Sequence, residues 1–292
     1  MGARETKGER VFYIINDILI ALVVACTLYP FVYILSASFS DPYAIARGDV
    51  ILLPKGFNDG AYAEVFQSDS LWNSYKNTLW YVVVGTFVNV LMTTIMAYPL
   101  SRKNFSGRKF INFFVAFTMF FTPPLVPTFL VVKGVGLMDN KWAMVIPTAI
   151  DAFYLIIMRS FFEALPDSII EAARIDGCND IQVLFRIVIR LSGPVMAVMV
   201  LFYAVYHWNS YFSALLYLND EAKYPLQMEL RKILLAVGGA NGMTNQVSDR
   251  KDLISLSVRY ATIIVSTVPI LCVYPFLQKY FVKGIMVGSV KG

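Results

Sequence analysis

Residues 165–194 read LPDSIIEAARIDGCNDIQVLFRIVIRLSGP, a polar stretch set between two long apolar segments. Pro166 suits the first turn of a helix, because that position needs no backbone donor. Gly177 predicts the end of this helix, because a residue without Cβ adopts the left-handed conformation without strain. Asn179 and Gln182 then have the spacing of a capping box, and apolar residues recur after them with helical periodicity. The stretch therefore predicts two short helices in succession.

The same stretch carries a specific motif. Glu171-Ala172-Ala173 is followed by Asp176-Gly177 and, farther on, by a hydrophobic residue and Pro194. This pattern resembles the EAA loop of ATP-binding-cassette (ABC) importer permeases, although the proline comes later than the family often has it. The resemblance implies a cytoplasmic coupling helix that docks in a groove on an ATPase subunit. The alternative is an amphipathic helix that lies on the bilayer without a partner. The residues to which the resemblance gives a coupling role are Glu171, Ala172, Ala173, Asp176 and Gly177.

The composition indicates a membrane protein independently of the motif. Hydrophobic residues make up 57% of the 292 residues, charged residues make up 15%, and the mean hydropathy is +0.59. These values are too apolar for a soluble domain. The net charge of +5 is explained by basic residues on one side of a membrane and needs no nucleic acid. Cys26, Cys178 and Cys272 lie too far apart to suggest a disulfide framework or a metal site.

The apolar segments predict an all-α polytopic membrane protein. The first segment could instead be a cleaved signal peptide, but its length and Pro30 favour a retained span. The short inner segments are richer in Lys and Arg than the short outer ones, which places both termini in the cytoplasm. We expect one transmembrane domain over 1–292, with outer loops at 38–75 and 219–257 and a cytoplasmic tail at 283–292. The sequence predicts about six transmembrane helices, over residues 11–37, 77–100, 110–132, 142–162, 195–218 and 258–281.

Two of these segments contain residues that do not suit a simple helix. Pro123, Pro124 and Pro127 remove backbone hydrogen bonds from the third segment, so it should kink or end early. Asp151 lies inside the fourth segment, where a lone carboxylate is a candidate for a functional site. It could instead be a structural hydrogen-bonding group that faces a wet cavity or a neighbouring subunit.

The fifth segment mixes aromatic and polar residues in LFYAVYHWNSYFSALLYL, residues 201–218. A sugar ring presents an apolar C–H face and a polar rim, which stacking rings beside hydrogen-bonding groups can bind. The aromatic residues could also belong to the interfacial belt and to helix packing. His207 is the single histidine, so metal binding or histidine catalysis within this chain has little support. The candidates for the substrate path are Asp151, Tyr206, His207, Trp208, Asn209 and Tyr211.

Four further stretches indicate which group of ABC importer permeases the chain resembles. FSDPYAI (39–45), GDVILLPKGF (48–57) and GAYAEVF (60–66), together with the basic hairpin YPLSRKNFSGRK (98–109), resemble carbohydrate-type ABC importer permeases of the maltose-transporter group. They are similar to the subgroup that takes up oligo- and polysaccharides. This resemblance implies the type I ABC importer permease fold and transport by alternating access.

The second outer loop and the tail have roles in that family. Leu226, Leu230, Ile233 and Leu234 predict an amphipathic helix in the loop at 219–257, before a Gly-rich tip. The resemblance implies that this loop can probe a sugar-binding protein. It also implies that the Gly-rich tail can enter the interface between two ATPase subunits.

The energy for transport must come from another subunit. No G-x-x-x-x-G-K-[ST] sequence occurs, so the chain cannot hold ATP in a P-loop of its own. We expect no cofactor and no enzyme activity in this chain, with ATP and Mg bound to separate ATPase subunits. The resemblance implies a complex in the bacterial inner membrane. Its expected partners are a second permease subunit, which family precedent makes a different chain, two ATPase subunits, an extracytoplasmic sugar-binding protein and membrane lipid.

Two other classes of function remain open. An ion-coupled secondary transporter acting without an ATPase would need coupling groups in the membrane, for which Asp17 and Asp151 are the candidates. A membrane-bound enzyme would need a cluster of catalytic groups, which the sequence lacks. Among sugars, the resemblance points to complex oligosaccharides, including acidic ones such as alginate-type uronates, without fixing charge, linkage or length.

Overall fold

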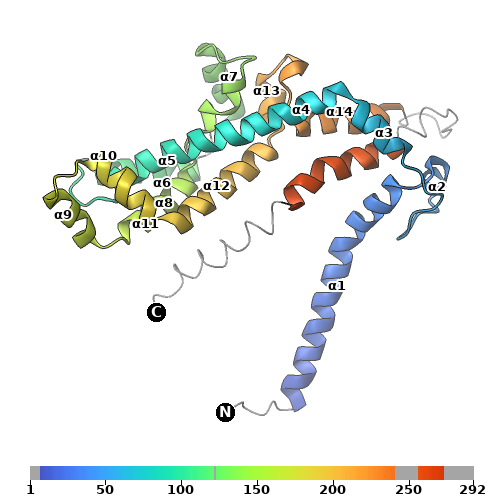
Figure 1. Cartoon of the computed structure of the whole chain (residues 1–292), viewed down its shortest axis with the longest axis horizontal. Coiled ribbons are helices and arrows are strands. Elements are labelled where there is room, and N and C mark those ends of the chain that lie inside the picture. The colour runs from blue at the N-terminus through green and yellow to red at the C-terminus, as the bar shows by residue number, and fades with distance from the viewer. Residues whose placement is uncertain (1–6, 122, 241–255, 273–292) are drawn as a thin grey trace. The chain divides into compact units, whose positions relative to one another are not determined.

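The described part of the chain is mostly helical, which confirms the predicted all-α class. The computed structural model describes residues 7–121, 123–240 and 256–272, and within these ranges it has helices joined by turns and no β-strand. The chain divides into two compact units, residues 1–69 with 230–268 and residues 70–229 with 269–292. Figure 1 shows the elements of both.

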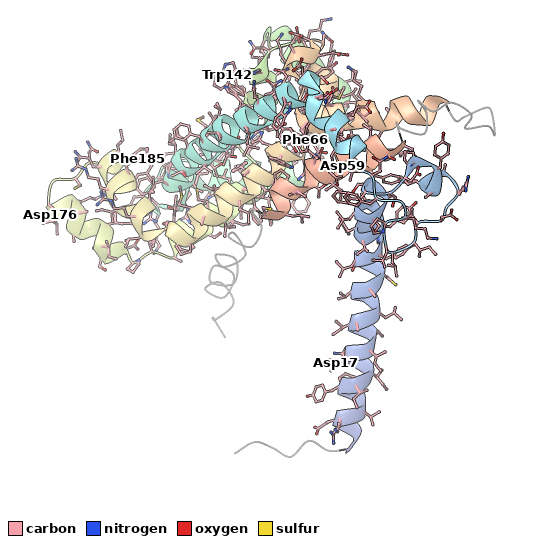
Figure 2. The ribbon with its side chains drawn as sticks, turned by 45° about the vertical axis from the view of Figure 1, so that its right-hand side comes forward. Asp17, Asp59, Phe66, Trp142, Asp176 and Phe185 are labelled. Atoms are coloured by element: carbon pink, nitrogen blue, oxygen red, sulfur yellow. The ribbon has the colours of Figure 1, made fainter. Side chains whose placement is uncertain are left out.

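The first unit begins with α1, Lys7–Ser38, a single helix of 32 residues that contains Pro30. It covers the predicted first span. Its apolar side chains are exposed along most of its length in the isolated chain, and Asp17 lies on this exposed helix in Figure 2. A helix that is apolar all round suits a surrounding of lipid or partner protein.

The loop after α1 is partly helical. It contains α2, Pro42–Ala46, and α3, Gly60–Gln67. The hydroxyl of Ser38 lies 2.8 Å from the hydroxyl of Tyr62, which ties the end of α1 to α3. The small buried core of this unit is formed by Ala37, Ile45 and Val50.

The second unit is built around two helical stretches that lie side by side (Figure 1). The first runs through α4, Asp69–Trp80, a π-helical turn η1, Tyr81–Gly85, and α5, Thr86–Ser101. The second is α12, Gly193–Trp208. Two further helices pack against α5, namely α6, Arg108–Phe120, and α8, Ala152–Glu163.

The core of the second unit lies between α5, α8 and α12. It is mostly apolar, but it also buries polar side chains whose partners lie on a facing helix. Because these side chains are satisfied across the core, they fix how the helices meet. The buried apolar side chains at the centre are Ala97 and Leu100 of α5, Leu155, Met158 and Phe162 of α8, and Met199 and Tyr203 of α12.

The third predicted span is broken, as the sequence indicated. α6 ends at Phe120, and α7, Leu125–Gly134, begins after Pro124. Proline has no backbone N–H and its ring clashes with the preceding turn, so a helix does not continue through Pro123 and Pro124. The segment 110–132 therefore forms two helices and not one.

The fourth predicted span, 142–162, is not a continuous helix. Two short 3-10 turns, Lys141–Met144 and Ile146–Thr148, precede α8, and the two halves are bent by 52°. Pro147 lies in the second turn, and Asp151 begins a new helix as its N-cap. The proline and the N-capping aspartate together break the segment, which the sequence alone predicted as a single span.

The fifth predicted span, 195–218, is also interrupted. α12 ends at Trp208, and α13, Phe212–Tyr217, follows after a short break. The side-chain amide of Asn209 donates to the carbonyl of Val205, four residues earlier, at 2.9 Å. Such local bonds compete with the continuation of a helix.

The loop at 219–257, predicted to lie on the outer side, contains η5, Glu221–Lys223, and α14, Leu226–Ala240. The helix predicted in this loop is therefore confirmed. A further helix, Leu256–Cys272, covers the first part of the predicted sixth span. The Gly-rich tip beyond residue 240, the end of the sixth span and the tail at 283–292 lie outside the described residues.

Two helices in the described ranges are long and apolar enough to cross a membrane, Gly8–Ser38 and Asp69–Ser101. Two bent pairs, Lys141–Thr148 with Ala152–Glu163 and Asp180–Leu191 with Gly193–Trp208, would raise the number to four. Two other apolar helices are shorter. The count of about six spans and the cytoplasmic placement of both termini stay predictions.

Candidate functional site

The turn between the two short helices of the quoted stretch is a Schellman motif. α9, Asp167–Ile175, ends where Gly177 takes a φ of +82°. The amide of Gly177 donates to the carbonyl of Arg174 at 3.0 Å, and the amide of Cys178 donates to the carbonyl of Ala173 at 3.0 Å. These two bonds satisfy carbonyls that the helix end leaves open. The predicted end of the first helix is confirmed.

The second helix begins at the predicted capping box. Asn179 Oδ1 accepts the amide of Gln182 at 2.8 Å, and Gln182 Oε1 accepts the amide of Asn179 at 3.0 Å. From here α10, Asp180–Val183, continues through a π-helical turn, Leu184–Val188, into α11, Ile189–Leu191. A helix–turn–helix segment with both of its turn ends capped has a well-defined shape.

A sharp bend separates this segment from the next span. The chain bends by 87° between Asp180–Leu191 and Gly193–Trp208. Pro194 lies in the first turn of α12, where its missing N–H removes no helical hydrogen bond. The late proline therefore begins the following helix and does not distort the two short ones.

α9 has a buried face and an exposed face. Ile170 and Ala173 are buried in the core of the unit. Glu171 and Ala172 are exposed on the other face. The motif residues therefore lie on two faces of α9. Ala173 packs in the core, whereas Glu171 and Ala172 are exposed on the surface.

Large apolar side chains are exposed beside this face. Ile175 is 86% exposed and Ile181 is 70% exposed. Figure 2 shows Asp176 at the tip of the α9–α10 segment and Phe185 on the turn that follows α10. Grouped exposed apolar side chains next to a carboxylate are typical of a protein-binding surface.

Ion pairs tie the basic hairpin, residues 102–109, to α9 and α8. Arg102 Nη1 lies 3.6 Å from Asp167 Oδ1 at the start of α9. Arg108 pairs with Glu163 at the end of α8, and its Nε donates to the backbone at the end of α5. The α9–α10 segment is therefore joined through the basic hairpin to the ends of α5 and α8.

Reversal of the Arg108 charge should weaken this joint. In Arg108→Glu, two carboxylates would meet where the native side chains are only 20% and 35% exposed. We expect the melting temperature of the purified complex to fall, with a loss of about 1–3 kcal/mol of stability. Adding Glu163→Arg should restore only part of this loss, because Arg159, now 3.4 Å from Glu163, would repel the new cation. An unchanged melting temperature for Arg108→Glu would contradict the joint.

A mostly apolar cavity of about 750 Å³, with aromatic and a few polar side chains in its lining, lies beside α12 and the break that follows it. It brings together three of the predicted path residues, Tyr206, Asn209 and Tyr211. Tyr154 of α8 also lines it. The sequence does not single out Tyr154, because nothing in the fourth segment distinguishes it from the neighbouring aromatic residues.

Asp151 is close to this cavity but has a structural role at the start of α8. Its Oδ1 accepts the amide of Tyr154 at 3.0 Å, as an N-cap does. Its own amide donates to the hydroxyl of Tyr203 at 3.2 Å. The carboxylate therefore holds Tyr154 in the wall of the cavity and is not itself among the lining residues.

His207 and Trp208 lie away from the cavity. His207 is fully buried, and its Nε2 lies 2.9 Å from Asn89 Oδ1. A Cβ placed on Gly85 would lie 2.4 Å from the same nitrogen, so α12 and η1 make a very close approach here. Trp208 is 9% exposed. His207 therefore packs α12 against η1 and α5, and the largely buried Trp208 ends α12.

A polar clasp joins the loop after α7 to the loop after α13. Asp139, which has a φ of +54°, accepts the amides of Asn219 at 3.1 Å and Asp220 at 3.0 Å through Oδ1. Lys223 Nζ lies 2.9 Å from Asp139 Oδ2. These hydrogen bonds, with that from the Asp220 amide the strongest, lower the pKa of Asp139 to about 2.

Asp139→Asn should remove the charge of this clasp and keep its amide acceptor, because asparagine also tolerates positive φ. The lowered pKa means that the carboxylate contributes stability in full above pH 3.8 and loses it as the pH falls toward 2. The melting temperature of the wild-type complex should therefore exceed that of Asp139→Asn by the same amount at all pH values down to about 4. A difference that vanishes at neutral pH would contradict this assignment.

Comparison with known proteins gives a consistent set of matches. The family model described as "Binding-protein-dependent transport system inner membrane component" matches residues 89–287. The chain is 43% identical to the polygalacturonan/rhamnogalacturonan transport system permease protein YtcP of Bacillus subtilis (strain 168), over 96% of this chain and 97% of the relative. It is 44% identical to protein LplC of the same organism, over 98% and 97%.

Solved structures give the same result. A chain of a bacterial ABC transporter involved in the import of the acidic polysaccharide alginate matches with a TM-score of 0.88 and 36% identity, over 96% of this chain and 100% of that chain. A chain of a bacterial alginate ABC transporter in complex with its pentasaccharide-bound periplasmic protein has a TM-score of 0.57 at 16% identity, which shows the fold alone.

Proposed function

The chain belongs to the family of binding-protein-dependent transport system inner membrane components, and from this premise we propose that it is one permease subunit of an ABC importer for oligo- or polysaccharides. A permease subunit of this kind is an inner-membrane protein and not an enzyme. The observation that carries the proposal is the capped α9–α10 segment, which exposes Glu171 and Ala172 and is joined by ion pairs to the core helices.

The partners follow from the family. An extracytoplasmic binding protein delivers the substrate, and a second permease subunit forms the other half of the path. We further propose two ATPase subunits that bind ATP and Mg, since this chain has no P-loop. The second permease is a different chain in this proposal, as in the family group that the sequence resembles.

Coupling is proposed to pass through α9 and α10. Glu171 can pair with a basic group on the ATPase, and the small Ala172 permits a close approach. Ala173 holds α9 to the core, while Asp176 and Gly177 shape the turn. When the ATPase subunits close on ATP, α9 moves, and the ion pairs of Asp167 and Glu163 pass the movement to α5 and α8. The path then alternates between outward and inward access.

The substrate path is proposed to include the cavity that Tyr206, Asn209, Tyr211 and Tyr154 line. Rings and amide or hydroxyl groups can bind the two faces of a sugar. Asp151 orients Tyr154 through its bond to the Tyr154 amide. The relatives suggest acidic polysaccharide fragments as the first substrates to test. One relative is a polygalacturonan/rhamnogalacturonan permease, and one solved structure is of a transporter involved in the import of alginate.

An ion-coupled transporter without an ATPase is the weaker explanation. It depends on a membrane carboxylate that exchanges ions, and Asp151 is committed to capping α8. Uptake by this chain alone, driven by an ion gradient in proteoliposomes, would favour it over the ABC importer.

The substrate class can be tested on the whole complex, purified with its ATPase subunits and reconstituted with the binding protein. ATPase activity is measured with oligogalacturonides, alginate oligosaccharides and neutral arabino-oligosaccharides. The proposal predicts that one class stimulates ATP hydrolysis and is taken up, with the acidic classes expected first. If no ATPase co-purifies and no sugar stimulates hydrolysis, the proposed function is wrong.

A further inference from the structure

The break between Thr148 and Asp151 leaves backbone groups that need partners inside a membrane span, where water is not available to bond them. Two of these groups are met by side chains from other helices. The amide of Asp151 donates to Tyr203 Oη of α12 at 3.2 Å. The carbonyl of Thr148 accepts from Asn89 Nδ2 of α5. Side chains of α5 and α12 thus bond the free backbone groups of the broken span.

Each of these two side chains is oriented by a buried partner of its own. Thr93 Oγ1 lies 2.7 Å from Tyr203 Oη, and His207 Nε2 lies 2.9 Å from Asn89 Oδ1. Because Tyr203 Oη accepts a hydrogen bond from the Asp151 amide, its own O–H is free to donate to Thr93 Oγ1. Because Asn89 Nδ2 donates to the break, its Oδ1 accepts a hydrogen bond from the N–H of His207 Nε2. All four side chains are at most 1% exposed.

The spacing of these residues explains why the two bonds reach the same place. Asn89 and Thr93 are four residues apart on α5, and Tyr203 and His207 are four residues apart on α12. Residues at this spacing lie on one face of a helix. The facing pairs therefore form two polar rungs between α5 and α12, and each rung ends on one side of the break.

The position of the break determines the position of Tyr154. The Tyr154 amide is bonded to the Asp151 carboxylate at 3.0 Å. The Tyr154 ring lies 5.0 Å from the Tyr203 ring, edge to face, and stacks on Phe202 at 5.1 Å. Tyr154 lines the cavity, whereas Asn89 and Tyr203 are not among its lining residues.

We propose that Asn89 and Tyr203 are positioning residues of the transport path: they bind the open backbone groups of the helix break and thereby set Tyr154 in the cavity wall. Thr93 and His207 orient them. None of the four contacts the sugar. The proposal rests on the proposed function only where it identifies the cavity as part of the path.

The variants for the test are Tyr203→Phe, which removes one hydroxyl, and Asn89→Leu, which removes the amide at similar volume. The matched control is Thr86→Val. Thr86 lies at the start of the same helix, and its buried hydroxyl has no hydrogen-bond partner within the described residues. A change that follows only from losing any buried hydroxyl would appear in this control too.

The first measurement needs no sugar. In the full complex, Cys26, Cys178 and Cys272 are replaced by serine and Tyr154→Cys supplies a single thiol. The rate of its modification by a small polar maleimide reports where position 154 stands. The rate should rise in Tyr203→Phe and in Asn89→Leu and stay at the parent value in Thr86→Val.

The second measurement is uptake of an oligogalacturonide mixture by complexes that retain Tyr154. We expect kcat/KM to fall by about tenfold in Tyr203→Phe and Asn89→Leu, the equivalent of one lost buried hydrogen bond. Thr86→Val should stay near the wild-type value. If the wild-type complex takes up no oligogalacturonide, the proposed substrate class fails, while the maleimide rates still decide the present proposal.

A second variant covers the case in which Asn89→Leu does not assemble, since it leaves His207 Nε2 without its partner. Asn89→Leu with His207→Leu removes both polar groups, a change that is often nearly neutral for stability. It should assemble and still show the faster maleimide reaction. Parent-like rates at position 154 in assembled Tyr203→Phe and in this double variant would overturn the proposal.

Discussion

Gly177→Val should uncouple ATP hydrolysis from sugar uptake. The residue has a φ of +82° and makes the left-handed turn between α9 and α10. A β-branched side chain disfavours this conformation by about 1–2 kcal/mol, so the turn should open and displace Glu171 and Ala172. We expect the sugar transported per ATP hydrolysed to fall by about tenfold. Uptake and ATPase activity are measured together on the reconstituted complex.

Gly136→Val is the matched control for this variant. Gly136 has a φ of +74°, and at both glycines an added Cβ would meet no atom of the described residues within 4 Å. The two substitutions therefore introduce the same kind of strain, but Gly136 lies in the loop after α7. Gly136→Val should lower stability without changing the ratio of uptake to hydrolysis. An equal loss of coupling in both variants would show that strain in general is responsible.

Gly85→Ala should destabilise the complex strongly. The new Cβ would lie 2.4 Å from His207 Nε2 and 2.6 Å from its Cε1, closer than real atoms approach. His207 cannot swing away easily, because it is fully buried and bonded to Asn89. Overpacking of this kind costs about 1–3 kcal/mol. We expect a clear fall in melting temperature.

Gly134→Ala is the control, since a Cβ there would meet no atom of the described residues within 4 Å at the end of α7. It should leave the melting temperature nearly unchanged. Removing the obstructing ring in Gly85→Ala with His207→Ala should recover part of the loss, because the clash disappears although Asn89 loses its partner. If Gly85→Ala is as stable as Gly134→Ala, the close packing of α12 on η1 is incorrect.

The parts of the fold that the sequence predicted are those set by neighbouring residues. Gly177 ends a helix because of its own backbone, and Asn179 with Gln182 begins one through bonds three residues apart. Pro123 and Pro124 break the third span for an equally local reason. In each case the deciding interaction lies within one or two turns of the residue.

The parts that it did not predict depend on residues far apart in the chain. The break at Asp151 is stable because Tyr203 and Asn89 satisfy its backbone. His207 was a candidate for the path by composition, but a close approach to Gly85 places it in the core. Tyr154 of α8 lines the cavity for the same kind of reason, because α8 begins at a break that distant residues hold in place. Neither periodicity nor motif spacing contains such information.

The proposed coupling depends on docking of the α9–α10 segment on an ATPase subunit. It is tested most directly with a photoreactive probe on Ala172→Cys, in a complex whose native cysteines are replaced by serine. Asn219→Cys, on the loop that the sequence places on the outer side, is the control. In a complex that retains sugar-stimulated ATPase activity, we expect the probe at 172 to capture an ATPase subunit and the probe at 219 to capture none. Failure of the probe at 172 to capture an ATPase in such an active complex would contradict it.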